Sequence, residues 1–136
     1  MSSVRPENSL IPTAGWHCRH FFYRWRRDVL RGLEEAVRGE GREQFVDVLD
    51  PGAPGGPARL QTFTVSGHKA DFGLLALDSD PLLLDGLHQR LMSSPLGPAL
   101  QAVWSFVSLT EVSEYVPTVE RYVEQLAAEV LPEGMA

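Results

Sequence analysis

The chain has 136 residues, of which 43% are hydrophobic and 22% are charged, and its formal net charge at pH 7 is −6. This length and composition are typical of one globular domain with a buried core. The negative charge argues against nonspecific nucleic-acid binding, which needs a basic surface that displaces counterions from phosphates.

The sequence shows neither a membrane-spanning run nor a secretory leader. No apolar stretch approaches the roughly 20 residues that a bilayer requires, and residues 1–15 lack the basic and apolar regions of a signal peptide. We therefore expect a cytoplasmic protein without membrane contacts. Its single cysteine, Cys18, excludes an internal disulfide and any zinc site with two thiolates. The hydrophobic neighbours of Cys18 favour a buried thiol over a nucleophile.

The chain begins with a polar segment and then a strand. Residues 1–14 have no hydrophobic period, whereas residues 16–24 are rich in aromatic side chains and fit a strand. We therefore divide the chain into an N-terminal tail, residues 1–14, and a single domain, residues 15–136.

A helical period follows that strand. Hydrophobic residues recur at helical spacing over residues 25–37, and we expect Gly39 and Gly41 to end this helix. Residues 43–49 fit either a short helix or a strand. Residues 51–57 are almost all proline and glycine and predict a loop.

A hairpin is predicted next. Residues 59–66 alternate as a half-buried strand does, and residues 70–77 are almost wholly apolar, as in a central strand. Gly67, His68 and Lys69 form the tight connection between the two. Gly67 can supply a positive φ, while Asp71 can accept hydrogen bonds from the turn.

Local signals also mark the C-terminal elements. Asp80 as N-cap and Pro81 at the first helical position begin a helix, which residues 93–95 break. Its expected inner stripe consists of Leu83, Leu84, Leu87 and Leu91. Residues 103–110 form the last strand, and Thr118 can cap a final amphipathic helix. The resulting order, β-α-β-β-α-β with a C-terminal helix, predicts an α+β ferredoxin-like (split βαβ) fold, with an antiparallel sheet and helices on one face.

The histidines do not predict a metal site. The four are His17, His20, His68 and His88. His17 and His20 lie on one strand at a spacing of three, so their side chains point to opposite faces. No short-spaced histidine motif of the kind that holds zinc occurs.

The charged groups are also explained without catalysis. The carboxylates Asp71, Asp78, Asp80 and Asp85 fit capping and solvation better than paired acid–base chemistry. The basic cluster of Arg24, Arg26, Arg27 and Arg31 can bind an anion, but a solvated helix face is the favoured interpretation. No phosphate-binding glycine loop or serine-nucleophile motif is present.

Three segments resemble the chlorite dismutase family, especially its coproheme decarboxylase branch. Residues 65–72, Val-Ser-Gly-His-Lys-Ala-Asp-Phe, are similar to a turn of that family, and residues 104–115 resemble its Tyr-Ser-Phe-x-Ser-x-x-Glu strand. Gly15-Trp16-His17 before an aromatic strand, and Ser94-Pro95-Leu96-Gly97, occupy matching places. The resemblance covers residues 15–125 and implies a ferredoxin-like domain of the dimeric α/β-barrel superfamily.

The resemblance also implies that the two halves of a family subunit have different roles. Family subunits have two related halves, and the porphyrin binds in the C-terminal half, whose motifs have no match here. We therefore expect no catalytic, cofactor-binding or metal-binding residue in this chain. Haem or coproheme would be held by a separate C-terminal polypeptide within a higher oligomer, for peroxide-dependent coproheme decarboxylation in haem biosynthesis. The candidates for a structural turn or interface are Gly67, His68, Lys69, Asp71, Trp104 and Tyr115.

Two alternatives remain open. One is a non-enzymatic, homo-oligomeric scaffold or regulator derived from the same family. The other is a small cofactor-free monooxygenase, which requires polar groups such as His20, Tyr23 or Trp104 to point into a pocket between sheet and helices. In every case, apolar residues on both faces of the outer strands predict that the sheet face without helices is covered.

Overall fold

The structure is a computed structural model that describes residues 15–110 and 118–130. The expected tail, residues 1–14, and the interface candidate Tyr115 lie outside the described residues. Among the helices that are described, none is both long enough and apolar enough to cross a membrane.

A four-stranded antiparallel sheet forms the centre of the domain. Its strands are β1 (His17–Trp25), β2 (Arg59–Thr64), β3 (Phe72–Asp78) and β4 (Leu100–Leu109). Their spatial order is β2-β3-β1-β4, and every neighbouring pair is antiparallel. This order is that of the split βαβ motif, so the ferredoxin-like α+β prediction is confirmed. The predicted hairpin is the β2–β3 pair.

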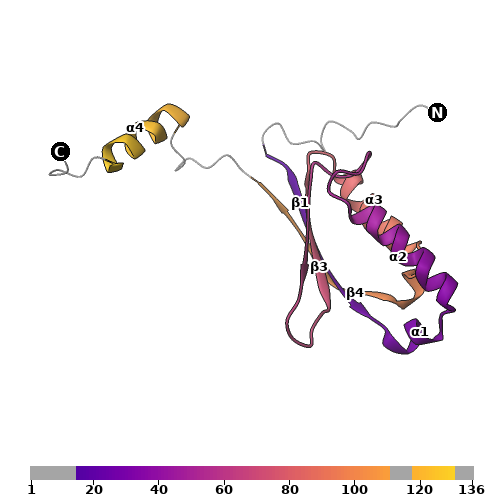
Figure 1. The fold of residues 1–136 in the computed structure, drawn as a ribbon. Coiled ribbons are helices and arrows are strands. Elements are labelled where there is room, and N and C mark those ends of the chain that lie inside the picture. Colours follow the sequence, from indigo (N-terminus) through magenta and orange to yellow (C-terminus); the bar gives the residue numbers. More distant parts are fainter. Residues whose placement is uncertain (1–14, 111–117, 131–136) are drawn as a thin grey trace, which may run out of the picture.

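The helices are α1 (Arg27–Gly32), α2 (Glu35–Leu49), α3 (Pro81–Met92) and α4 (Val119–Val130), with a short 3-10 turn, η2 (Gly97–Ala99), before β4. Helices α2 and α3 lie side by side on one face of the sheet, whereas α4 lies apart from it (Figure 1). The predicted cap of α4 is present, since Thr118 Oγ1 accepts from the Arg121 N–H at 3.3 Å.

Helix α3 forms where the sequence predicted it. The Asp80 carboxylate accepts a hydrogen bond from the Leu82 N–H at 2.9 Å, and Pro81 occupies the first turn. Leu84, Leu87 and Leu91 are fully buried against the sheet and α2. Burying each such side chain contributes roughly 1.5–3 kcal/mol.

The first helical segment differs from the prediction. Trp25 ends β1, α1 is only a short helix, and α2 runs through Gly39 and Gly41 to Leu49. The expected glycine stop is therefore wrong, and the ambiguous residues 43–49 are helical. Gly41 is buried because Leu96 crosses α2 there: a Cβ at this position would lie 2.4 Å from the Leu96 Cγ. The glycine permits close packing and does not end the helix.

The hydrophobic core lies between the sheet and the helices. Its most deeply buried members are Phe21, Tyr23, Leu74, Leu84, Leu87 and Leu91. Side chains alternate along a strand, so the neighbours of Phe21 and Tyr23 on β1 point to the opposite side of the sheet. No described helix covers that side (Figure 1).

Candidate functional site

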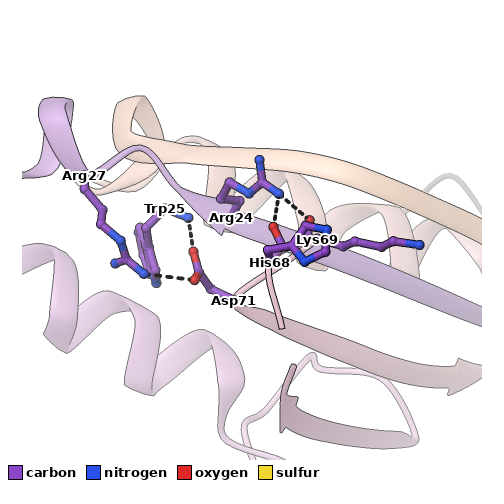
Figure 2. Close-up of polar contacts among 6 residues, drawn as sticks. All are labelled: Arg24, Trp25, Arg27, His68, Lys69 and Asp71. Carbon is purple, nitrogen blue, oxygen red and sulfur yellow. Dashed lines mark hydrogen bonds and ion pairs between the residues drawn. The ribbon is translucent and has the colours of Figure 1, made fainter. Parts of the chain in front are cut away.

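The turn between β2 and β3 is fastened to the end of β1 through Asp71. The Asp71 Oδ2 accepts a hydrogen bond from the Trp25 N–H at 2.7 Å, and its Oδ1 lies 3.1 Å from Arg27 Nη2 (Figure 2). One carboxylate therefore stabilises both the last residue of β1 and the first residue of α1. The predicted role of Asp71 as an acceptor is present, but its partners lie on another strand and helix.

Arg24 holds the other side of the same turn. Its Nη2 donates to the Lys69 carbonyl at 2.9 Å and to the His68 carbonyl (Figure 2). Gly67 has a φ of +132°, a conformation that side-chain-bearing residues rarely adopt. The four predicted turn residues are thus brought together, with their backbone fixed from β1. The side chains of His68 and Lys69 are exposed.

The sheet face opposite the helices, which we call the open face, carries a group of mostly aromatic side chains. It comprises His20, Phe22, Phe63, Leu75, Trp104 and Phe106, which the strand register places on one side. His20 stacks on Phe106 with ring centroids 4.0 Å apart, and Phe22 stacks on Trp104 at 5.5 Å. The Trp104 side chain is nonetheless 61% exposed.

A hollow of about 440 Å³ connects the open face to the turn. It is lined by Phe22, Val65, Lys69, Ala70, Val103 and Trp104. Two of the predicted interface candidates, Lys69 and Trp104, therefore border one mostly apolar depression. Such a surface suits an apolar partner with an acidic group at its edge.

A partly buried polar pair lies on the helix side of the sheet. The Tyr23 hydroxyl and His88 Nδ1 are 2.7 Å apart, and both rings lie in an aromatic stack with Phe21. Burial raises the pKa of the Tyr23 phenol well above its usual range. The pKa of His88 is lowered, first by burial and further by Arg19, while Asp85 opposes the shift.

This arrangement separates the groups that a cofactor-free monooxygenase pocket would need. Tyr23 is fully buried in the core, whereas His20 and Trp104 lie on the open face. The three side chains therefore do not line a common pocket between sheet and helices.

The described histidines His20, His68 and His88 lie in separate environments. No group of three His, Cys, Asp or Glu side chains able to hold a metal occurs among the described residues. His20 stacks on Phe106, His88 contacts Tyr23, and His68 borders a small hollow of about 260 Å³ with Arg24 and Asp71.

The sequence interpretation did not identify two residues that contact the β2–β3 turn. Arg24 and Arg27 were grouped as a solvated helix face, but Arg24 belongs to β1 and both contact the turn. The signal that identifies Arg24 is an arginine at the end of an apolar strand, where alternation places it beside the hairpin.

Comparison with known families identifies a related sequence profile. The profile described as chlorite dismutase matches residues 36–135. The match begins within α2 and includes the β2–β3 turn, the β4 strand and α4.

Solved structures with the same fold include two from different bacteria. A protein from Thermus thermophilus, described as a novel heme-binding protein, is 23% identical with a TM-score of 0.62, over 79% of this chain and 47% of that one. A mutant chlorite dismutase from Candidatus Nitrospira defluvii is 14% identical with a TM-score of 0.62, over 94% of this chain and 52% of that one. The chain therefore spans about half the length of the structures it matches.

Proposed function

Because the chain belongs to the chlorite dismutase family, we propose that it is the half of a haem-dependent enzyme that does not hold the haem. A second ferredoxin-like half, supplied by a separate polypeptide, covers the open face and binds the porphyrin. The reaction we assign to the pair is peroxide-dependent decarboxylation of coproheme.

The observation that carries this proposal is the open face itself. Phe22, Trp104 and Phe106 form a continuous aromatic surface that no described helix covers. Soluble proteins rarely leave such surfaces in water unless a partner buries them. A second half of the same fold offers a sheet of matching size and an apolar face.

The contribution of this chain is to bind and position its partner. Asp71 and Arg24 fix the turn against β1, so that Lys69 and Trp104 keep their places around the hollow. In this proposal the second half supplies the chemistry of the porphyrin. The heme-binding description of the matched Thermus thermophilus protein supports the cofactor class.

The proposal is tested by native mass spectrometry of the affinity-tagged chain isolated from its own source, before and after addition of ferric coproheme. We expect a complex containing one second polypeptide and one porphyrin per pair. Trp104→Asp places a charge on the open face and should abolish the complex. Val46→Asp, at an exposed position on α2, is the matched control and should retain it.

Three results contradict the proposal. They are recovery of the wild-type chain alone, porphyrin binding by the chain without a partner, and a Trp104→Asp variant that assembles normally. A homo-oligomer that takes up no coproheme would instead support the non-enzymatic scaffold.

A further inference from the structure

The two edge strands of the sheet differ in the features that prevent pairing with another strand. The β2 edge is six residues long, begins with Arg59 and presents polar side chains such as Gln61 and Thr62. The β4 edge is ten residues long and contains no charged residue and no proline. Natural edge strands are usually kept short, charged or interrupted, because a free edge pairs with other strands. β4 has none of these protections.

The backbone of β4 is oriented for such pairing. The Thr110 N–H donates to the Trp16 carbonyl at 2.8 Å, toward the β1 side. Because the direction of backbone groups alternates along an antiparallel ladder, the N–H and C=O groups of Ser105, Val107 and Leu109 point away from β1. Within the described residues, β4 pairs with β1 alone. The side chain of Val107 is 59% exposed.

We propose that β4 pairs antiparallel with β4 of a second copy of this chain, about a two-fold axis at Val107. In this register Val107 lies opposite the partner's Val107, and Ser105 lies opposite the partner's Leu109. The three outward residues then form about six interchain hydrogen bonds, two for each directly bonded pair. The β-bulge between Phe22 and Tyr23 changes the β1–β4 register on the N-terminal side of Trp104. A two-fold axis at Val107 therefore allows Ser105, Val107 and Leu109 all to form interchain hydrogen bonds.

A second copy fits this edge better than an unrelated strand does. Antiparallel pairing of a strand with itself is two-fold symmetric, which is the commonest symmetry of homo-oligomers. An uncharged strand also meets itself without like charges placed opposite each other. The pairing joins the two sheets edge to edge and leaves Trp104 and Phe106 on the open face. It therefore does not depend on the proposed function.

The first test compares one substitution on each edge by size-exclusion chromatography with light scattering. The wild-type chain alone should be a dimer. Val107→Lys puts a charge at the centre of the pairing and should give a monomer, whereas Thr62→Lys on β2 should remain a dimer. A monomeric wild type, or a Val107→Lys variant that stays dimeric, would overturn the proposal.

A cross-linking test covers the case in which Val107→Lys does not fold. Directly bonded antiparallel residues have Cα atoms about 5.5 Å apart, a separation that a disulfide spans. In a Cys18→Ser background, Val107→Cys should form a covalent dimer on mild oxidation, and Thr62→Cys should not. Absence of the Val107→Cys dimer, or equal cross-linking at both edges, would contradict the two-fold pairing.

Discussion

At the scale of single residues, Asp71 connects the β2–β3 turn to the end of β1 and the start of α1. Its carboxylate is partly buried and accepts the Trp25 N–H, while the paired Arg27 guanidinium is largely exposed. The exposed ion pair contributes little, because water screens it. The hydrogen bond to a backbone amide contributes more, since its loss leaves a donor without an acceptor.

Asp71→Ala should therefore lower the free energy of unfolding by about 1–3 kcal/mol. Asp71→Asn keeps an acceptor oxygen near Trp25 and should cost clearly less than alanine. Urea unfolding monitored by circular dichroism measures both, with Asp28→Ala on the exposed face of α1 as a control near zero. Equal losses in the asparagine and alanine variants would show that charge, not the hydrogen bond, is decisive.

The Tyr23–His88 pair gives the fold an acid sensitivity. Burial lowers the pKa of His88 below its ordinary value of 6.5, so the unfolded chain binds a proton that the folded chain resists. The stabilisation is fully present above pH 6.5 and is lost as the pH falls through the folded-state pKa. We expect the unfolding free energy of the wild type to fall as the pH drops below 6.5, toward the lowered pKa of His88.

His88→Gln keeps a polar partner for the Tyr23 hydroxyl but does not titrate in this range. Its unfolding free energy should change less over the same pH interval, although its stability at pH 7.5 is lower. Parallel pH profiles for the two proteins would exclude His88 as the source of the acid sensitivity.

At the scale of elements, two glycines of α2 separate helix propensity from packing. In a helix interior, alanine is more favourable than glycine by about 1 kcal/mol of helix propensity. At Gly39 the nearest atom to an added Cβ is 4.0 Å away, so Gly39→Ala should stabilise the chain by up to that amount. At Gly41 the Cβ would lie 2.4 Å from the Leu96 Cγ, and overpacking of about 1–3 kcal/mol should dominate. Thermal unfolding should move in opposite directions for the two variants; a stabilised Gly41→Ala would contradict the close packing.

The same pair of glycines shows why sequence predicted some elements and not others. The α3 helix was predictable because its signals, Asp80, Pro81 and the leucine stripe, are adjacent in sequence. Gly41 was wrongly predicted to end the helix, because the residue that requires a glycine there, Leu96, lies far along the chain. Local rules favour the stop, and a tertiary contact overrides them.

The candidate site was predictable to the same extent. Resemblance located the turn residues Gly67 to Asp71 correctly, since they are contiguous. The contacts of that turn with Arg24 and Arg27 required the β1–β3 register, which only the fold supplies. The contiguous residues of such a site can therefore be identified from a single sequence, whereas their contact partners on other elements require the structure.

At the scale of the whole molecule, the described residues expose apolar surface in three places. They are the open face, the β4 edge and the α4 helix, where Val119, Tyr122, Val123 and Leu126 are exposed at helical spacing. An isolated helix as short as α4 is only marginally stable in water. A domain with this distribution is suited to assembly, because contact with another chain would remove these apolar side chains from water.

The open face and the β4 edge are distinct surfaces, and an apolar fluorescent dye can separate them. Anilinonaphthalene sulfonate binds exposed apolar surface, and the aromatic group around Trp104 is such a surface. The chain alone should therefore enhance the dye's fluorescence, and Trp104→Gln should remove most of that enhancement. The monomeric Val107→Lys variant should keep the enhancement, since its substitution lies on the helix side of β4.

Addition of the porphyrin-binding half should abolish dye binding to the wild type. Loss of dye binding in Val107→Lys, with Trp104→Gln unaffected, would show instead that the β4 edge is the main exposed apolar surface.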